Sequence, residues 1–382
     1  MTDSCTAFSK CGGCSLLNVP YEKQLEEKLH RVSALLAPFC PVSAIHGMDE
    51  PRHYRNKVTA TFSRGGKGQL IWGRFEEGTR KVVAAPDCLI ENETAVEIIE
   101  RFGKLAAGFR FTAFDPVSGT GLLRHVQVRT AAATGQVMLT VVTGSPAFPS
   151  RKNFVAELKK QCPELTTVLQ SVNGRRTGMI LGDRVETLYG PGFIEDEILG
   201  KRFRLSPRSF YQVNPIQTGK LYALALDCAA LTKRQRVIDA YSGIGTIGLC
   251  AAASALSVIG CELNADAVHD AELNRRQNRI ENARFVCADA GEFMVREAAS
   301  GRKADVVFMD PPRAGADRKF LDALLLSAPS RIVYVSCGPE TLARDLRVLT
   351  AGGYRALRAE CVDMFPMTEH VETVVLMSRD KE

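Results

Sequence analysis

Residues 236–248 read Arg-Val-Ile-Asp-Ala-Tyr-Ser-Gly-Ile-Gly-Thr-Ile-Gly, and the fold assignment starts from them. The stretch Arg236-Val-Ile-Asp239 is branched and apolar, which predicts a buried strand. Gly243, Gly245 and Gly248 follow at once, and glycines let the backbone turn tightly and approach a ligand before a helix begins. A glycine loop alone can be only a tight turn, so its neighbours must show whether it binds anything.

The sequence after residue 206 alternates between strand and helix patterns. Further strands are predicted at 257–262, 284–288, 305–310, 331–335, 354–361 and 372–377, with helices at 246–255, 265–278, 318–327 and 340–350. This alternation predicts an α/β fold, a Rossmann-like, mostly parallel sheet with helices on both faces, over residues 206–382. Ligands of such sheets bind beyond the carboxyl ends of the strands.

Carboxylates stand at those strand ends. Glu262 closes the strand after the glycine loop and is placed to accept hydrogen bonds from ribose hydroxyls, and Asp289 closes the third strand. Together they predict a pocket for a nucleoside cofactor. The glycines formally fit a dinucleotide loop, but Asp239 before them and Asp310-Pro-Pro-Arg313 after the fourth strand favour S-adenosylmethionine, because that segment resembles those beside the reactive methyl group in nucleic-acid methyltransferases.

The first 205 residues follow a different pattern. Strands are predicted at 58–62, 126–130 and 137–142, with one early helix at 20–36. We therefore expect three segments: an N-terminal segment with a cysteine site (1–90), a β-rich central domain (91–205, which can be continuous with 40–90) and the α/β domain (206–382).

Composition limits the class of protein. Of the 382 residues 45% are hydrophobic and 24% are charged, which is typical of a soluble globular protein and excludes collagen-like, disordered and membrane-spanning classes. The net charge of +6 permits an anionic partner. The first ten residues contain no apolar signal segment, so a cytoplasmic location without disulfides is expected for the 12 cysteines.

Two residues at strand ends are candidates for catalysis. Cys337 follows the strand at 331–335, and a helix starting near Glu340 would direct its dipole towards the thiol and favour thiolate. Glu372 opens the last strand. An ordinary buried cysteine and a solvated carboxylate are the alternatives.

Four segments carry a resemblance to a known family. Ser209-Phe-Tyr-Gln-Val-Asn, Asp310-Pro-Pro-Arg-Ala-Gly, the stretch from Ser336 to Asp345, and Asp363-Met-Phe-Pro-Met-Thr-Glu-His-Val-Glu372 together resemble the RNA 5-methyluridine methyltransferases. The resemblance runs from Cys5 to the C-terminus and implies a class I methyltransferase fold. It implies methyl transfer from S-adenosylmethionine to uracil C5 in ribosomal or transfer RNA. Many members carry Asn where this chain has Thr246.

The resemblance also implies roles for single residues. The nucleophile matches Cys337 and the general base matches Glu372. The S-adenosylmethionine site matches Gln212, Tyr241, Glu262, Asp289 and Asp310, and Phe210 would lie near the target base. Chemistry agrees, because uracil C5 is a poor nucleophile until a thiolate adds at C6, and a base must later remove the C5 proton.

Four further cysteines have the spacing of a metal site: Cys5, Cys11, Cys14 and Cys88. Spacing alone suits zinc and an iron–sulfur cluster equally. The resemblance implies a [4Fe-4S] cluster, since ribosomal-RNA members of the family carry one on this pattern. The cluster would be structural or would position RNA, because methyl transfer needs no redox step.

The expected substrate is therefore 23S ribosomal RNA, bound by a monomer with neither DNA nor membrane as partner. Transfer RNA modified at uridine 54 is the alternative. Cytosine methylation normally goes with a Pro-Cys nucleophile, whereas this chain has Ser336-Cys337, and a non-catalytic RNA-binding assembly factor would need neither Cys337 nor Glu372. We expect no N-terminal barrel domain before Cys5. We expect the β-rich central domain, residues 91–205, to bind RNA. The predicted RNA contacts are Arg52, Tyr54, Arg55, Lys57, Arg74, Arg80, Lys81, Arg124, Arg129, Arg175, Arg176, Lys201, Arg202 and Arg204.

Overall fold

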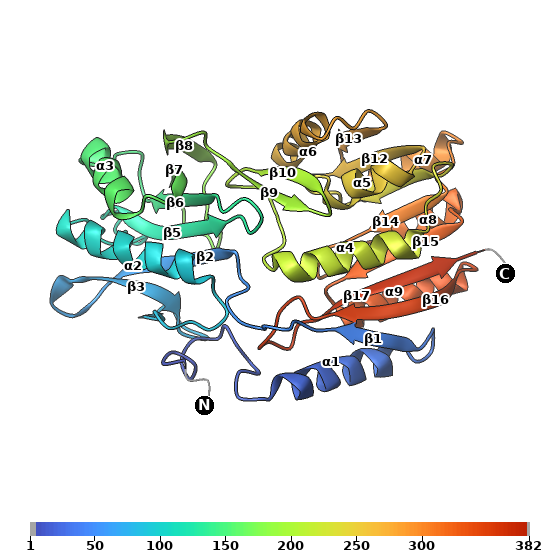
Figure 1. Cartoon of the computed structure of the whole chain (residues 1–382), viewed down its shortest axis with the longest axis horizontal. Coiled ribbons are helices and arrows are strands. Elements are labelled where there is room, and N and C mark those ends of the chain that lie inside the picture. The colour runs from blue at the N-terminus through green and yellow to red at the C-terminus, as the bar shows by residue number, and fades with distance from the viewer. Residues whose placement is uncertain (1–4, 380–382) are drawn as a thin grey trace. The chain divides into compact units, whose positions relative to one another are not determined.

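A computed structural model of the chain describes residues 5–379, and Figure 1 labels most of its helices and strands. Two compact units can be distinguished by their internal contacts. The first contains the residues up to Asn18, Pro51–Glu197 and Leu205–Arg208. The second contains Val19–Glu50, Ile198–Arg204 and the residues from Ser209 onward.

The second unit is built on an eight-stranded sheet in the order β1-β16-β17-β15-β14-β11-β12-β13. Its strands are β1 (Val42–His46), β11 (Arg236–Ala240), β12 (Ser257–Glu262), β13 (Ala283–Cys287), β14 (Val306–Met309), β15 (Arg331–Ser336), β16 (Arg355–Val362) and β17 (Glu372–Ser378). All neighbours are parallel except that β17 runs antiparallel to β15 and β16. The predicted, mostly parallel sheet is therefore confirmed.

Helices cover both faces of this sheet (Figure 1). They are α1 (Tyr21–Leu36), α4 (Pro215–Ala229), α5 (Thr246–Ala251, continued by the 3-10 turn Ala252–Ser254), α6 (Ala265–Gln277), α7 (Ala290–Ala299), α8 (Arg318–Ser327) and α9 (Pro339–Ala351). Apolar residues of α1, α7, α8 and α9 share one core with the sheet, and α4, α5 and α6 pack against its other face. The α/β, Rossmann-like class predicted from the sequence is correct.

Residues 19–50 are predicted to belong to the N-terminal segment 1–90, but they group with the second unit. The reason is strand pairing. β1 joins the sheet in parallel beside β16, so that the blue strand and the red strand of Figure 1 are neighbours. Without β1, β16 would have an unpaired edge.

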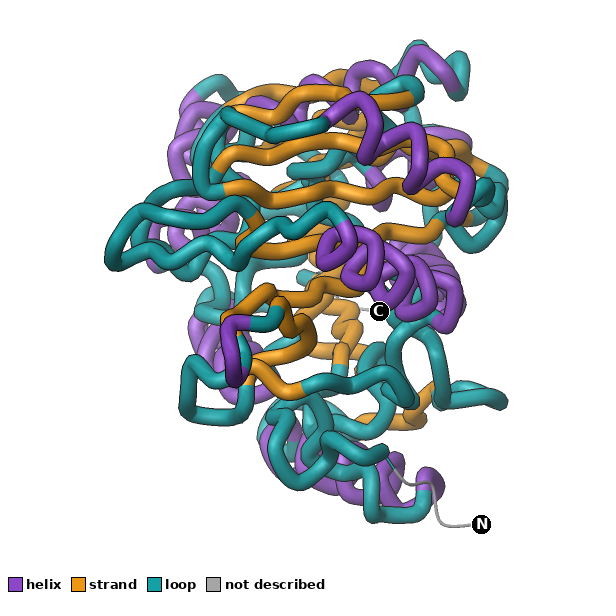
Figure 2. Tube along the Cα trace, turned by 90° about the vertical axis from the view of Figure 1, so that its left-hand side faces the viewer, coloured by secondary structure: helices purple, strands orange, loops and turns teal. Residues whose placement is uncertain are grey.

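The first unit contains a seven-stranded sheet in the order β4-β3-β2-β5-β6-β7-β8, antiparallel except between β6 and β7. Its elements are β2 (Lys57–Arg64), the 3-10 turn Gly66–Gly68, β3 (Leu70–Phe75), β4 (Val82–Val83), α2 (Glu93–Gly108), β5 (Leu123–Thr130), β6 (Val137–Thr143), α3 (Arg151–Gln161), β7 (Leu165–Val172) and β8 (Arg184–Tyr189). Figure 2 shows these strands in orange and the helices in purple. Phe102 of α2 and Phe154 of α3 meet at 5.3 Å between ring centroids in the shared core. A separate pair, β9 (Ile194–Ile198) and β10 (Lys201–Leu205), follows.

The order of strands places the candidate site. From β11 the chain adds β12 and β13 on one side, and then β14 and β15 on the other side of β11. Helices on opposite faces therefore diverge above β11 and β14, and a ligand can enter between them at the carboxyl ends of these strands.

Candidate active site

Three of the predicted reactive residues come together at one edge of the eight-stranded sheet. Asp310 directly follows β14, and Cys337 directly follows its neighbour β15. Glu372 opens the antiparallel strand β17, and the next residue, Thr373, pairs with Ser336 at the end of β15. A carboxylate from an antiparallel strand is thereby brought to the edge where the parallel strands end.

The charges of these groups act on one another. Burial, followed by the charges of Glu372 and Asp310, raises the pKa of the Cys337 thiol to about 11. Burial and the charge of Asp310 also raise the pKa of Glu372. Burial and the two carboxylates therefore favour the neutral thiol, in the opposite direction to the effect expected from the dipole of α9.

Glu372 is almost completely buried, with 3% of its surface exposed. Its Oε2 atom is buried and makes no hydrogen bond to any of residues 5–379. A buried carboxylate oxygen without a partner costs free energy, so such a group is expected where function requires it.

Arg313 is a functional candidate that the sequence did not single out. Its guanidinium lowers the pKa of both Cys337 and Glu372, opposing burial. The Asp-Pro-Pro-Arg turn that carries it is fixed to α9, because Thr341 Oγ1 donates to the Arg313 carbonyl at 3.2 Å. The buried Asp345 Oδ2 accepts a hydrogen bond from the Ala316 amide at 2.8 Å. The signal for Arg313 was its place in the Asp-Pro-Pro-Arg motif.

The glycine loop after β11 has the backbone geometry of a binding loop. Asp239 is buried, and its Oδ2 accepts a hydrogen bond from the Gly248 amide at 2.8 Å. Gly245 has a φ of +83°, and a Cβ there would lie 2.5 Å from the Phe285 ring. A Cβ added at Gly243 would meet no described atom within 4 Å beyond its chain neighbours, so space is open beside the loop.

The two predicted strand-end carboxylates have distinct environments. Glu262 ends β12, and its two carboxylate oxygens accept hydrogen bonds from the amides of Gly243 at 3.0 Å and Asn264 at 2.8 Å. Asp289 begins α7 as its N-cap, accepting from the Glu292 amide at 3.0 Å. The carboxylate of Glu262 therefore joins the glycine loop to the end of the next strand.

Tyr241 and Gln212 also belong to the second unit. Tyr241 has a φ of +65°, a conformation that costs free energy for a residue with a side chain, and its ring lies 5.3 Å from that of Phe320. Next to it, Ser242 Oγ is buried without a hydrogen-bond partner among residues 5–379. Gln212 is 7% exposed in the segment that leads into α4.

Phe210 differs sharply from its neighbours in exposure. Its side chain is 62% exposed, whereas Ser209 and Tyr211 on either side are buried. Ser209 Oγ is hydrogen-bonded to the buried carboxylate of Asp270. An exposed ring on a firmly held segment suits stacking on a nucleic-acid base.

The four cysteines of the predicted cluster lie in the first unit and are partly exposed: Cys5, Cys11, Cys14 and Cys88. Burial, followed by the charges of Cys11 and Cys5, raises the pKa of Cys14 to about 11. Thr6 donates from its amide and its hydroxyl to the Asp87 carboxylate at 2.9 and 2.8 Å, which ties the segments of Cys5 and Cys88 together. Within residues 5–379, however, no group of three or more His, Cys, Asp or Glu side chains is placed to hold a metal ion.

Several of the predicted RNA contacts serve the fold of the first unit instead. Arg74 forms an ion pair with Glu91, and Arg124 donates to three backbone carbonyls. Arg129 is 2% exposed and donates to a backbone carbonyl at 3.2 Å, and Tyr54 is also buried. Arg129 and Tyr54 are thus buried away from a nucleic acid in this conformation, so their prediction as RNA contacts is wrong. Arg74 and Arg124 are partly exposed and already engaged in contacts within the fold.

Comparison with known proteins adds independent findings. Residues 195–380 match the family model described as tRNA (Uracil-5-)-methyltransferase. An uncharacterized RNA methyltransferase of Listeria monocytogenes is 41% identical over 379 residues, which cover 98% of this chain and 83% of the relative. An uncharacterized RNA methyltransferase of Halalkalibacterium halodurans is 39% identical over 378 residues, which cover 98% of this chain and 82% of the relative.

A solved structure is also similar over nearly the whole chain. The tRNA (uracil-54, C5)-methyltransferase of Pyrococcus abyssi, in complex with S-adenosyl-L-homocysteine, has a TM-score of 0.79 and 28% sequence identity. The similarity covers 96% of this chain and 86% of that one.

Within residues 5–379, no helix combines the length and the apolar character that crossing a membrane requires.

Proposed function

The chain belongs to the RNA (uracil-5-)methyltransferase family, whose members use S-adenosylmethionine, and from that premise we propose that it methylates C5 of a specific uridine in 23S ribosomal RNA. The observation that carries the proposal is the meeting of Cys337, Glu372 and Asp310 at one sheet edge. A thiol and a buried carboxylate in mutual electrostatic contact are the two groups that uracil C5 methylation needs.

The reaction would proceed in two covalent stages. The Cys337 thiolate bonds to uracil C6, and the electron pair of the C5–C6 double bond moves onto the C4 oxygen as an enolate. C5 then takes the methyl group from the sulfonium of S-adenosylmethionine, leaving S-adenosylhomocysteine. The Glu372 carboxylate removes the C5 proton, the C5–C6 double bond re-forms, and the sulfur of Cys337 leaves as thiolate.

The residues proposed to hold S-adenosylmethionine are Gln212, Tyr241, Glu262, Asp289 and Asp310. The open space at Gly243 and the unpartnered Ser242 Oγ support a ligand at this loop. A cationic methyl donor here would also offset the carboxylates that raise the pKa of Cys337. Many members of the family have Asn at the position of Thr246. In this chain the Thr246 hydroxyl donates a hydrogen bond to the Tyr222 hydroxyl at 3.3 Å.

The proposed cluster ligands are Cys5, Cys11, Cys14 and Cys88, holding a [4Fe-4S] centre. Their spacing and the Thr6–Asp87 contacts support this, while the thiols would have to close further around a metal. No step of the methyl transfer involves this centre, so its role would be structural or in positioning RNA. The cysteine pattern is also the reason for preferring ribosomal RNA.

Transfer RNA modified at uridine 54 is the second candidate substrate. The structural likeness to the Pyrococcus abyssi tRNA (uracil-54, C5)-methyltransferase favours it. For either RNA, the exposed Phe210 is proposed to stack near the target base, which must leave its own stack to reach Cys337. Either substrate is consistent with a proposed cytoplasmic location.

The experiment supplies S-adenosylmethionine labelled in its methyl group to the purified protein, with 23S ribosomal RNA and unmodified transfer RNA in parallel. Digestion to nucleosides should give labelled 5-methyluridine from ribosomal RNA alone. Label from transfer RNA would keep the chemistry and overturn the substrate. Absence of label from both RNAs, with S-adenosylmethionine binding shown separately, would overturn the enzymatic proposal in favour of a non-catalytic RNA-binding factor.

A further inference from the structure

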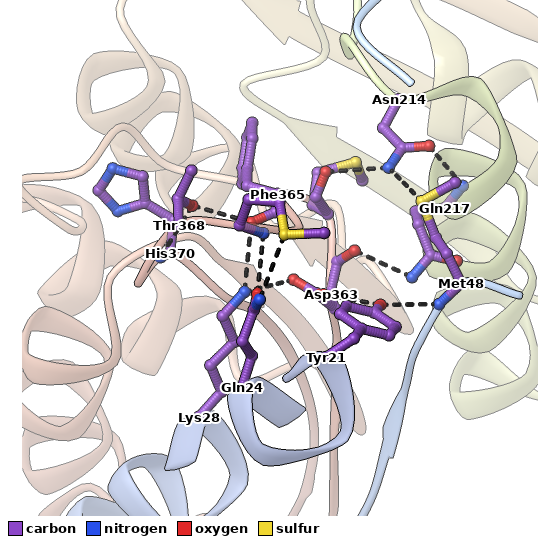
Figure 3. Close-up of polar contacts among 12 residues, drawn as sticks. Tyr21, Gln24, Lys28, Met48, Asn214, Gln217, Asp363, Phe365, Thr368 and His370 are labelled. Carbon is purple, nitrogen blue, oxygen red and sulfur yellow. Dashed lines mark hydrogen bonds and ion pairs between the residues drawn. The ribbon is translucent and has the colours of Figure 1, made fainter. Parts of the chain in front are cut away.

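The loop between β16 and β17, residues 363–371, leads directly into the proposed base Glu372. Figure 3 labels Asp363, Phe365, Thr368 and His370 of this loop. At its start the buried Asp363 accepts a hydrogen bond from Lys28 Nζ at 2.6 Å and one from the Tyr21 hydroxyl at 2.8 Å. The side chains of Lys28 and Asp363 are 2% and 0% exposed. An ion pair that is shielded from solvent in this way holds its geometry firmly, because separating the charges would leave a buried charge without a partner and cost free energy.

Helix α1 contacts the middle of the same loop. Gln24 Oε1 accepts from the Met367 amide at 2.9 Å, and Lys28 Nζ also donates to the Phe365 carbonyl at 3.2 Å. Met367 has a φ of +66°, so this backbone is held in a conformation that a residue with a side chain rarely adopts. Tyr21, Gln24 and Lys28 follow a helical spacing of three and four residues, which places all three on one face of α1.

The start of α4 holds the loop from a second direction. Gln217 Nε2 donates to the Asp363 carbonyl at 3.0 Å, and Asn214 Nδ2 donates to the Met364 carbonyl at 3.1 Å. Figure 3 shows side chains from α1 and α4 reaching the same loop. Two helices that are far apart in the sequence therefore fix its backbone.

This matters for Glu372 because its Oε2 has no hydrogen bond within residues 5–379 that could orient it. The direction of the carboxylate then depends on the packing around it and on the backbone that carries it, which is held by pairing with Val362 of β16 and by the loop that precedes it. A general base has to lie within hydrogen-bond reach of the proton that it removes, and misplacement by about 1 Å costs about 10²-fold in rate.

We propose that Tyr21, Gln24 and Lys28 of α1 are positioning residues for Glu372, acting through Asp363 and the loop 363–371. The inference rests on the proposed function and gives α1 a part in the removal of the C5 proton. Loss of these contacts should leave addition of Cys337 and methyl transfer largely intact, and should slow the step that releases the methylated RNA.

The test follows the covalent protein–RNA adduct after a single turnover with labelled S-adenosylmethionine, on denaturing gels. Lys28→Met should form adduct at close to the wild-type rate and resolve it about 10²-fold more slowly. Tyr21→Phe, a milder change, should slow resolution about tenfold, and it keeps the test valid if Lys28→Met does not fold. Tyr354→Phe is the matched control, because Tyr354 is buried in the same unit and donates to the Pro329 carbonyl at 2.7 Å.

Resolution of the adduct at the wild-type rate in both α1 variants would overturn the inference, as would equal slowing in Tyr354→Phe. Glu372→Gln distinguishes failure of the inference about α1 from failure of the proposed role of Glu372. If it stalls as adduct while the α1 variants do not, only the inference fails. If Glu372→Gln itself turns over normally, the proposed role of Glu372 fails, and the inference fails with it.

Discussion

Replacing Glu372 by Gln should remove activity and raise stability at the same time. The substitution keeps the size of the side chain and removes its ability to take a proton. Because general bases contribute about 10²–10⁴-fold, kcat should fall by that factor, and the protein should accumulate as a covalent RNA adduct through Cys337.

The effect on stability follows from the environment of the carboxyl group. Burial and Asp310 raise the pKa of Glu372 from 4.5 to about 8. The folded state therefore favours the protonated form, and this relative stabilisation is complete below pH 4.5 and is lost as the pH rises through 8. Between pH 4.5 and pH 7 the free energy of unfolding should fall by roughly 3 kcal/mol, because the interval spans about 2.5 pH units at about 1.36 kcal/mol each. Gln cannot ionise, so the variant escapes this fall.

The assay compares midpoints of urea unfolding for the two proteins at pH 5 and pH 8, alongside adduct formation on gels. The variant should gain stability relative to the wild type as the pH rises. Glu297→Gln is the control, because Glu297 is a buried carboxylate paired with Arg302 at 3.0 Å and should lose stability instead. A Glu372→Gln protein with the pH dependence of the wild type, or with its turnover, would refute the reasoning.

Three further predictions concern the same groups and the cysteine site. Cys337→Ala should form neither adduct nor 5-methyluridine while still binding S-adenosylmethionine, which equilibrium dialysis would show; product formation would contradict the nucleophile assignment. Arg313→Gln should raise the pKa of Glu372 and Cys337 further, which moves the rising limb of the pH–rate profile to higher pH. For each pH unit of that movement, kcat/KM near neutral pH should fall about tenfold. Arg318→Gln is the control and should leave the profile unchanged, because the exposed side chain of Arg318 pairs with Asp322. Anaerobically purified protein should absorb near 400 nm and bleach on reduction, and Cys14→Ser should weaken that absorption; a colourless preparation containing only zinc would contradict the cluster.

Much of the second unit could be predicted because its sequence repeats one simple pattern. Branched apolar strands such as 257–262 end at polar residues, and their shared sheet edge follows from parallel pairing. This was enough to place Asp310 near Cys337. The antiparallel direction of β17, which brings Glu372 to the same edge, was not visible in the sequence and came only through the resemblance.

Other features depend on contacts that no local pattern encodes. Lys28 and Asp363 are 335 residues apart, and α1 was assigned to the wrong part of the chain because nothing near it indicates pairing of β1 with β16. Arg129 looked like an RNA contact because arginine is usually exposed, yet it lies in a strand buried on both faces. Helix α4 carried a readable signal, Asn214 as N-cap followed by Pro215, although no helix was predicted there.

The covalent role of Cys337 beside Glu372 is the central claim, and RNA containing 5-fluorouridine tests it most directly. Fluorine takes the place of the C5 proton, and a base cannot abstract it. The reaction should therefore stop after methyl transfer, with the protein still bonded to the RNA. We predict a stoichiometric adduct that depends on S-adenosylmethionine and that peptide mass spectrometry locates on Cys337. An adduct on another cysteine would contradict the account. So would the absence of any adduct under conditions in which unmodified RNA yields 5-methyluridine.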